Sequence, residues 1–291
     1  MYSGLAYIFW NINPEIFRIG NISFRYYSLF FYIGIMLAWV VIFWIYSKEK
    51  IPSSLFFKLS FYYLFGGLLF GPRLVHCLFY EPAHYLAYPL EIFLPFRIHN
   101  GNFIWTGYRG FASHGAAIGF IVGIILYCWR TGLGIVKILD ITAISVPLPS
   151  CLIRLGNLMN SEIIGKPADL PWSFVFTKID ILPRHPAQIY EAIAYLMLLF
   201  VMIRLYKKHR LRIHKGFYLG LCFFGIFIFR FFVEFIKENQ ISAENSMILN
   251  LGQWLSIPFI IAGLVLCLYP KFSKINNLIK KKHHVEKVHS D

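Results

Sequence analysis

Three arginines stand within apolar stretches of the sequence, at Arg73, Arg154 and Arg230. If such a stretch crosses a membrane, each ionisable group costs about 2.5–3.5 kcal/mol on insertion scales, so each needs a partner or a function. A guanidinium is always charged and binds phosphate oxygens in a bidentate geometry. The pair Arg154 and Arg230 therefore indicates a site for a phosphate, where fixed cations would stabilise a phosphate leaving group.

The densest polar stretch begins at Arg154. Its polar side chains and glycines are Arg154, Gly156, Asn157, Asn160, Glu162 and Gly165. A continuing helix would hold Arg154, Asn157 and Asn160 on one broad face. On that helix Glu162 would point elsewhere, so we expect it to cap a turn or to pair with another element. The two glycines permit a close backbone approach or a positive φ.

Further polar residues are expected at the same depth, although they come from distant parts of the sequence. They are Tyr27, His114, His185, Gln188, Tyr190, Glu191 and Glu234. Glu234 follows Arg230 at i+4, so the two side chains can pair on one helix face. The chain has no HExxH, no GxSxG and no phosphate-cradling glycine loop. The chemistry that remains is that of a lipid-modifying transferase in which His114 or a carboxylate moves a proton.

Membrane-spanning helices must position these residues. Apolar residues make up 58% of the chain and charged residues 14%, against roughly 45–50% and roughly 25% in soluble domains. A helix that crosses a bilayer needs about 20 mostly apolar residues. Seven segments qualify, at 27–46, 55–79, 114–130, 138–154, 187–206, 216–236 and 247–269. The fourth is interrupted by Asp140, Pro147 and Pro149, so it requires shielding by neighbouring protein.

The cations indicate the orientation of the spans. Most of the 28 Lys and Arg residues lie in the segments 48–58, 130–137 and 204–215 and in the tail 271–291. The positive-inside rule then places the C-terminus in the cytoplasm and the N-terminus outside. Arg230 lies about 21 Å along its helix from Gly216, and Arg154 about 24 Å from Ile138, which places both in the outer half.

The predicted fold is an all-α integral membrane protein with seven transmembrane helices. We expect one polytopic domain, 1–270, followed by a basic cytoplasmic tail, 271–291, which either meets anionic headgroups or stays solvated. The outer loops 80–113 and 155–186 and the first 17 residues are rich in aromatic side chains, so we expect them to lie at the membrane interface.

Each polar residue also has a purely structural interpretation. Arg230 and Glu234 could form a buried ion pair that only fixes helix register. His185 and His114 could each satisfy a nearby backbone group, and the asparagine pair could join two helices by hydrogen bonds. Because so many segments contribute polar groups at one depth, a shared site is the favoured interpretation.

Ordered motifs along the chain carry a resemblance to a known family. They are SFRYYSLFFYIG, GPRLVHCLFY, SHGAAIG, Asp140, RLGNLMNSEIIG, PRHPAQIYEA, RFFVEFIKE and LNLGQWLSIPF. In this order they resemble the prolipoprotein diacylglyceryl transferase family, whose signature is similar to residues 154–165. The chain departs from the usual pattern at Ile153 and Ala116, where glycine is common, and at Pro149 and Cys151, where small residues are common. These departures concern backbone packing, whereas the polar set is complete.

The resemblance implies a multi-pass enzyme of the bacterial inner membrane. It would transfer the sn-1,2-diacylglyceryl group of phosphatidylglycerol to the lipobox cysteine thiol of a prolipoprotein, forming a thioether and releasing glycerol phosphate. The expected partners are that lipid, the signal peptide and membrane lipid; we expect no cofactor, no metal and no nucleic acid.

The resemblance also implies roles for individual residues. Arg154 and Arg230 would hold the lipid phosphate, and His114 and Tyr27 would line the reaction centre. The headgroup pocket would be shaped by Asn157, Asn160, Glu162 and Gly165. Further candidates for phospholipid binding are Arg73, His185, Gln188, Tyr190, Glu191 and Glu234. We expect His114 to be the general base, because histidine titrates nearest to neutral pH.

Two other classes compete with an enzyme: a transport or channel protein, and a non-catalytic lipid-binding or assembly factor. A transporter would spread polar residues through the membrane and often has an internal repeat. In this sequence the cytoplasmic half of each predicted span is nearly bare and no repeat is visible. A transferase is therefore the favoured prediction.

Overall fold

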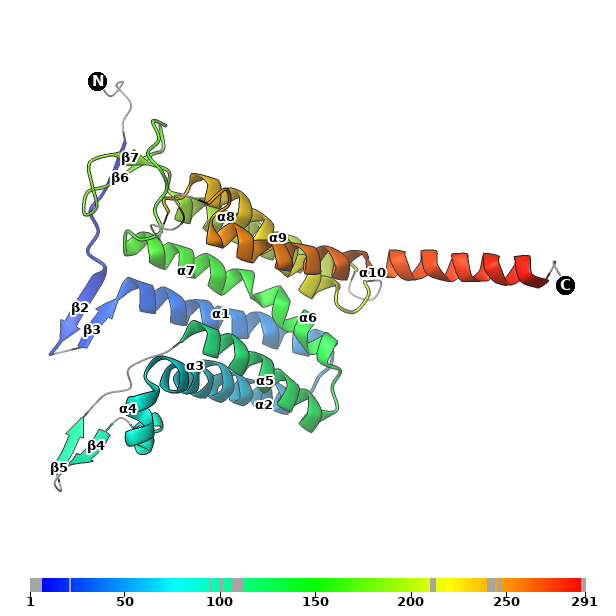
Figure 1. Cartoon of the computed structure of the whole chain (residues 1–291), viewed down its shortest axis with the longest axis horizontal. Helices are drawn as coiled ribbons and strands as arrows, with labels where there is room; N and C mark the ends of the chain where they lie inside the picture. Colours follow the sequence, from blue (N-terminus) through cyan, green and yellow to red (C-terminus); the bar gives the residue numbers. More distant parts are fainter. Residues whose placement is uncertain are drawn as a thin grey trace. The chain divides into compact units, whose positions relative to one another are not determined.

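The computed structural model describes residues 7–20, 22–94, 96–99, 102–105, 112–209, 213–239, 244 and 247–288. Within this part of the chain, seven helical segments are long and apolar enough to cross a membrane (Figure 1). They are Tyr26–Lys48, Ser53–Tyr80, His114–Thr131, Ile135–Met159, Ala187–His209, Phe217–Ile236 and Leu251–Tyr269. These segments match the seven predicted spans closely, which confirms a helical, multi-pass membrane protein.

The chain divides into two compact units. The first unit contains residues 1–42 and 140–291, and the second contains residues 43–139. The first span, α1 (Tyr26–Lys48), contributes to both units because the boundary falls within it.

The second unit is built on two spans, one of which is irregular. Its elements are α2 (Ser53–Tyr62), the π-helix η1 (Tyr63–Phe70), α3 (Gly71–Val75), the π-helix η2 (His76–Tyr80), α4 (Pro82–Ala87), the 3-10 helix η3 (Pro89–Ile92), strands β4 (Phe96–His99) and β5 (Asn102–Trp105), and α5 (Ser113–Thr131). Pro72 has no N–H group and its ring crowds the preceding turn. The π-helical winding just before it accommodates this disruption.

Glycines allow the two spans of the second unit to approach each other closely. A Cβ atom on Gly66 would lie 2.8 Å from the carbonyl oxygen of Gly119, and a Cβ atom on Gly119 would collide with the carbonyl oxygen of Gly66. Gly71 and Gly115 face each other in the same way. Small residues at such positions let helix backbones touch inside a membrane, where dispersion contacts replace the hydrophobic effect.

Replacing Gly119 with alanine should destabilise the second unit, because the new methyl group meets backbone rather than a movable side chain. Overpacking of this kind costs about 1–3 kcal/mol or more. The thermal unfolding midpoint of the purified protein in detergent measures the effect. Gly134→Ala is the matched control, because nothing lies within 4 Å of a Cβ atom there. Equal midpoints for the two variants would contradict the proposed packing.

The fourth span, which lies mostly in the first unit, is a broken helix. It consists of α6 (Ile135–Ser145) and α7 (Pro147–Met159), with the break at Val146 ahead of Pro147. Proline is tolerated in the first turn of a helix, so Pro147 and Pro149 begin α7 rather than kink it. The most apolar window of this span is 50% buried, more than that of any other span in the described chain. The expected shielding by neighbouring protein is therefore confirmed.

The remaining helices of the first unit are α8 (Ala187–His209), α9 (Phe217–Val233) with the 3-10 turn η4 (Glu234–Ile236), and α10 (Leu251–Val288). Helix α8 packs against α7 and α9, and α9 packs against α10. Asp140 of α6 accepts hydrogen bonds from the backbone N–H groups of Gly216 at 2.7 Å and Leu219 at 2.9 Å. These bonds satisfy the otherwise unpaired donors at the start of α9 and join α6 to it.

Short strands tie together the loops at one end of the first unit. They are β1 (Ile8–Trp10), β2 (Glu15–Ile19), β3 (Ile22–Arg25), β6 (Phe174–Phe176) and β7 (Pro183–Arg184). Strand β1 pairs in parallel with β6, β6 pairs antiparallel with β7, and β2 and β3 form a hairpin. The sequence did not predict these strands, because two to five residues are too few for a period-two pattern to be recognised.

Candidate functional site

The C-terminal end of α7 carries the start of the predicted polar stretch. Arg154 Nη1 donates a hydrogen bond to Asn157 Oδ1 at 3.3 Å, so these two residues share a helix face as predicted. The chain then turns through Ser161, whose φ is +53°. The N–H groups of Ser161 and Glu162 donate to carbonyls three and five residues earlier, as in a Schellman motif. This turn ends α7 and sets the direction of the loop that leads to α8.

The expectation that Glu162 would point away from the asparagines is wrong. Its Oε1 accepts hydrogen bonds from Asn157 Nδ2 at 2.7 Å and from Asn160 Nδ2 at 3.2 Å. Its backbone carbonyl accepts a third from Gln188 Nε2 at 2.7 Å, which joins the turn to α8. The expectation extended helical geometry through a residue that lies in the left-handed region, where an L-residue cannot continue the helix.

Helix α8 places a carboxylate against Arg154. Glu191 is fully buried, and its Oε2 lies 3.1 Å from Arg154 Nε. Tyr195, one turn further along α8, donates a hydrogen bond from its hydroxyl to Glu191 Oε1 at 3.2 Å. Since Arg154 is itself 12% exposed, this pair is largely removed from solvent and its geometry is held from two helices.

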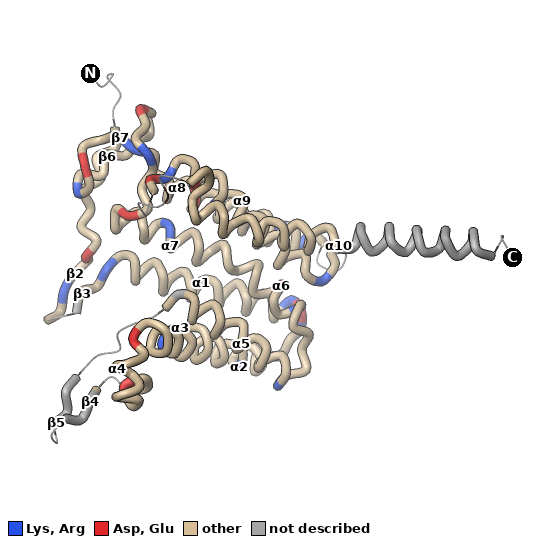
Figure 2. The backbone as a smooth tube through the Cα atoms, in the orientation of Figure 1, with Lys and Arg blue, Asp and Glu red and all other residues tan. Residues whose placement is uncertain are grey.

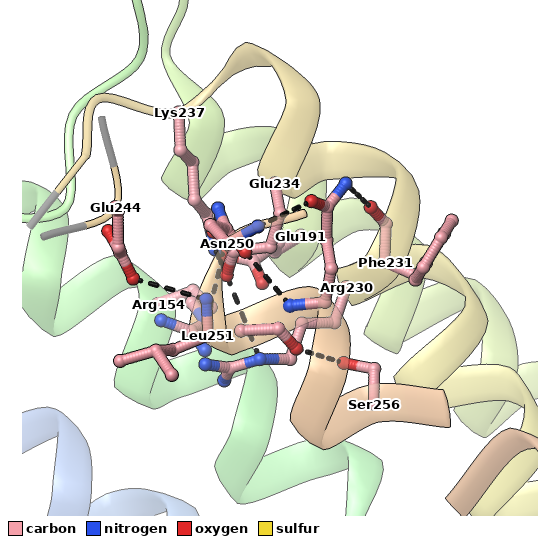
Figure 3. A network of polar contacts seen from close by, with 12 residues as sticks. Arg154, Glu191, Arg230, Phe231, Glu234, Lys237, Glu244, Asn250, Leu251 and Ser256 are labelled. Atoms are coloured by element: carbon pink, nitrogen blue, oxygen red, sulfur yellow. Dashed lines mark hydrogen bonds and ion pairs between the residues drawn. The ribbon is translucent and has the colours of Figure 1, made fainter. Parts of the chain in front are cut away.

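Helix α9 supplies the second arginine. Arg230 Nε lies 3.7 Å from Glu234 Oε1, which confirms the predicted i,i+4 pair. Lys237 Nζ lies 3.0 Å from Glu234 Oε1 and 3.1 Å from Glu191 Oε2. Opposite charges therefore alternate along five residues, which we call the ion-pair chain: Arg154, Glu191, Lys237, Glu234 and Arg230 (Figure 3).

The ion-pair chain is closed to solvent in its middle and open at the Arg230 end. The Lys237 side chain is 1% exposed and that of Arg230 is 34% exposed. A buried charge is tolerated only when it is paired, and Lys237 meets two carboxylates. Glu234 is the only residue in the described part of the chain that pairs with Arg230. The terminal nitrogens of Arg230 are thus available to an anion.

The start of α10 supports Glu234 from a third direction (Figure 3). Asn250 Nδ2 donates to Glu234 Oε2 at 3.1 Å, and Gln253 Nε2 donates to the carbonyl of Phe231 at 3.3 Å. A Cβ atom on Gly252 would lie 2.7 Å from Glu234 Cδ, so only glycine leaves room for the carboxylate there. Contacts from α8, α9 and the start of α10 therefore hold Glu191 and Glu234, the two carboxylates that pair with the arginines.

Gly165 lies where three segments of backbone meet. Its N–H donates to the carbonyl of His185, and Lys166 N–H donates to the carbonyl of Ile236 at 2.7 Å. A Cβ atom on Gly165 would lie 2.5 Å from His185 Cβ and 3.0 Å from the Ile236 carbonyl oxygen. The predicted close backbone approach is confirmed here, and it holds the residues before α8 beside those that carry Lys237.

Close approach is also confirmed at Gly156, on α7. A Cβ atom there would lie 2.9 Å from Tyr27 Cδ2, so the Tyr27 ring packs directly on the helix that carries Arg154. Tyr27 is half-buried in the second position of α1. The structure thus places Tyr27 of α1 against α7, which carries the predicted motif.

A small aromatic cluster lies at the start of α8. Tyr190 accepts a hydrogen bond from Trp172 Nε1 at 2.9 Å, and its hydroxyl lies 3.3 Å from His185 Nδ1. Burial lowers the pKa of His185 below its ordinary value, because a desolvated imidazolium is disfavoured. His185 is therefore a neutral hydrogen-bonding group at neutral pH rather than a third fixed cation.

Arg184, immediately before His185, is held by acidic partners outside the spans. Its guanidinium pairs with Asp180 and lies 2.6 Å from Glu238 Oε1. It also donates to the carbonyl of Gly165 at 3.1 Å. The hydrogen bond from Arg184 holds the pKa of Asp180 below its ordinary value.

This pairing predicts a loss of stability in acid. Because the pKa of Asp180 is lower in the folded protein than in the unfolded chain, the pairing stabilises the fold above the unfolded value, about 3.9, and this contribution disappears as the pH falls through the folded pKa. In detergent, Asp180→Asn should therefore unfold at a lower temperature than the unmodified protein at pH 7, and the difference should shrink at low pH. Asp169→Asn is the control, because it removes one carboxylate of the neighbouring loop, which accepts a hydrogen bond from the Tyr7 hydroxyl. A constant difference across pH would contradict the assignment.

Two predicted residues, His114 and Arg73, belong to the second unit. His114 is exposed in the first turn of α5. Arg73 is 2% exposed, and it donates to the carbonyls of Glu91 at 2.6 Å and Ile92 at 3.3 Å. Its guanidinium also lies 4.9 Å from the centroid of the Tyr85 ring. Arg73 therefore holds the backbone that follows α4, and its role in phospholipid binding stays a prediction.

Sequence reasoning missed three members of the site: Lys237, Tyr195 and Asn250. Tyr195 follows Glu191 at i+4, and Lys237 follows Glu234 at i+3, so helical spacing could have linked each to a residue already singled out. Asn250 could not be found in this way, because its contact with Glu234 crosses between two spans.

Comparisons with known proteins identify the family of this chain. A family model described as prolipoprotein diacylglyceryl transferase matches residues 14–269. The phosphatidylglycerol–prolipoprotein diacylglyceryl transferase of Bacteroides fragilis is 51% identical over 261 residues, which cover 89% of this chain and 94% of that protein. Proteins of the same name from Porphyromonas gingivalis and Chloroherpeton thalassium are 39% and 38% identical, over 89% and 90% of this chain and 93% of each relative. This chain belongs to the prolipoprotein diacylglyceryl transferase family.

Proposed function

We propose that this protein transfers the sn-1,2-diacylglyceryl group of phosphatidylglycerol to the lipobox cysteine thiol of prolipoproteins. The relatives' names specify the lipid and the acceptor protein. The observation that carries the proposal is the ion-pair chain, which holds two arginines in a largely buried cluster with the guanidinium of Arg230 open to an anion. A single phosphodiester fits such a site, because guanidinium groups bind phosphate oxygens in pairs.

The reaction is a substitution at carbon. The cysteine thiol loses its proton to a base. The sulfur then attacks the carbon of the diacylglyceryl group that is bonded to the phosphate oxygen. A carbon–sulfur bond forms, the carbon–oxygen bond breaks, and the phosphate departs as glycerol phosphate. Negative charge gathers on the leaving oxygen, so Arg154 and Arg230 lower the barrier most where that charge develops.

The other residues of the first unit have supporting roles in this proposal. Glu191 and Glu234 orient the arginines, and Lys237 keeps the two carboxylates paired. The headgroup pocket is shaped by Asn157, Asn160, Glu162 and Gly165, with Tyr27, His185, Gln188 and Tyr190 at its borders. Neutral amide and hydroxyl groups suit the uncharged glycerol of the headgroup, which they can bind without adding charge.

The proposal includes an orientation in the bacterial cytoplasmic membrane. Apart from the tail, the cations of the first unit's spans divide between Arg154 and Arg230 near one face and the 204–215 cluster near the other. Figure 2 shows that α8 and α9 carry charged residues toward their ends and none along their middle. With the 204–215 cluster and the basic tail 271–291 in the cytoplasm, transfer takes place on the outer side. Labelling of a cysteine introduced into the tail, by an impermeant reagent in intact cells, would overturn this orientation.

His114 is our candidate for the base that takes the thiol proton. His114→Asn keeps a hydrogen-bonding side chain but removes the titratable group, so transfer should fall about 100- to 10,000-fold. His84→Asn, a substitution in the same unit at a histidine that pairs with Glu91, is the control. Full activity of His114→Asn would exclude this role.

One assay tests the proposed function directly. Purified protein is incubated with radiolabelled phosphatidylglycerol and a lipobox peptide, or with the same peptide carrying serine in place of the cysteine. We expect label in the cysteine peptide alone, together with release of glycerol phosphate. Lipid binding without transfer would indicate a lipid-binding factor, and movement of lipid between leaflets without peptide labelling would indicate a transporter. Either outcome would overturn the proposal.

A further inference from the structure

The second unit contains another pair of cations, Lys58 and Arg130, which are not members of the ion-pair chain. A cavity of about 300 Å³ lies where α2 and α5 pack together. Its lining residues are Lys58, Phe61 and Tyr62 of α2 and Arg130 of α5. This volume is at the lower end of the range typical of small-molecule sites, which suits a headgroup rather than a whole lipid.

The carboxylates of the second unit lie next to other basic side chains than these two cations. Residues 43–139 contain three acidic side chains, Glu49, Glu81 and Glu91. Their partners are Lys137 at 3.1 Å, His76 at 3.5 Å and His84 at 3.0 Å, respectively. In the described part of the chain, neither Lys58 nor Arg130 forms an ion pair. The two cations are therefore open to an anion from outside the chain.

The surroundings of the two cations suit the boundary of a bilayer. Lys58, Phe61 and Tyr62 recur at i, i+3 and i+4, so they lie on one face of α2. The guanidinium of Arg130 lies 5.2 Å from the centroid of the Trp129 ring, and that ring is 73% exposed. Exposed aromatic rings beside basic residues at the ends of spans are typical of the headgroup level of a membrane.

We propose that this cavity binds the headgroup of an anionic phospholipid. Arg130 meets the phosphate with its planar fork, Lys58 adds a point charge, and the rings of Phe61 and Tyr62 contact the glycerol backbone of the lipid. Arg130 ends one span, and the next span, Ile135–Met159, starts at the same membrane face. That span crosses the membrane before it reaches Arg154, near its other end. The bound lipid therefore belongs to the opposite leaflet from the proposed transfer reaction, and it is not the substrate.

Native mass spectrometry of the full-length protein tests this site. Delipidated protein is titrated with phosphatidylglycerol or phosphatidylcholine of matched acyl chains, and the bound lipids are counted. In the double variant Lys58→Gln/Arg130→Gln, the lipid concentration at which half of the protein carries one phosphatidylglycerol should rise about 30-fold, because two headgroup contacts are lost. Lys208→Gln/Lys215→Gln is the matched control, because it removes the same charge from outside the cavity. Thermal unfolding midpoints identify any variant that fails to fold.

Three outcomes would overturn the proposal. The cavity variant could bind as many phosphatidylglycerol molecules as the control, or phosphatidylcholine could bind equally well, which would indicate ordinary annular lipid. Displacement of the lipid by millimolar inorganic phosphate would identify a free-anion site instead. Arg154→Gln separates this site from the transfer site: it should remove a different lipid, so a double variant should lose both. Failure of the transfer assay leaves this experiment unaffected.

Discussion

Replacement of Arg154 by glutamine is expected to lower the rate of diacylglyceryl transfer by about 100- to 1,000-fold, the usual cost of removing one group that stabilises charge in a transition state. Glutamine retains a hydrogen-bonding side chain but is shorter and carries no charge. The substitution also leaves the fully buried Glu191 with Lys237 as its remaining cation. The loss should appear chiefly in kcat/KM, measured with labelled phosphatidylglycerol and a lipobox peptide.

The matched control for this result is Arg204→Gln, which removes an exposed arginine near the end of α8. It should retain full activity. Arg154→Lys should recover only part of the rate, since an ammonium group cannot reproduce the two parallel hydrogen bonds of a guanidinium. Undiminished transfer by Arg154→Gln, with the protein folded, would remove Arg154 from the reaction and with it the proposed phosphate site.

Replacement of Lys237 by methionine should have the largest effect on stability. Its ammonium group is the only cation that contacts both Glu191 and Glu234 in the described chain. Breaking a buried ion pair from one side costs about 3–5 kcal/mol, because an uncompensated charge remains. The thermal unfolding midpoint in detergent should therefore fall strongly, and the remaining folded protein should show a raised KM for phosphatidylglycerol as Arg154 and Arg230 lose their fixed positions.

Two further variants separate positioning from bulk stability. Lys237→Arg should restore most of both properties, because it returns the charge to the same place. Lys166→Met removes an exposed lysine whose ammonium group donates to the carbonyl of Phe235 at 3.0 Å, so it should change neither property much. If Lys237→Met were as stable and as active as Lys166→Met, the ion-pair chain would not orient the arginines.

The sequence predicted those parts of the site that follow from spacing within one helix. Apolar runs located the seven spans, and i,i+4 spacing correctly paired Arg230 with Glu234. The same logic failed at Glu162, because a single residue, Ser161, takes a left-handed backbone conformation and reverses the chain. Nothing in the residue type announces that turn, since glycine or asparagine is the usual choice at such a position.

Contacts between helices were beyond the reach of the sequence for a different reason. The pairing of Arg154 with Glu191 depends on how α7 and α8 pack, and no periodicity within either helix encodes that choice. Lys237 was overlooked because it follows the last turn of its span, where a lysine ordinarily marks only the membrane boundary. The hydrogen bonds from Arg73 to backbone carbonyls of the following loop were likewise not visible in the sequence, and its role in lipid binding stays a prediction.

The ion-pair chain also constrains how this protein is made. Its five members come from the fourth, fifth and sixth spans and from the residue after the sixth. While the ribosome is still synthesising α9, Glu191 of the fifth span has Arg154 beside it but lacks Lys237. The Glu191 carboxylate gains its second cation, Lys237, only when the sixth span has been inserted and packs against the fifth. A nascent chain that ends before residue 237 therefore cannot assemble the proposed catalytic cluster, so the competence to modify prolipoproteins arises only late in biogenesis.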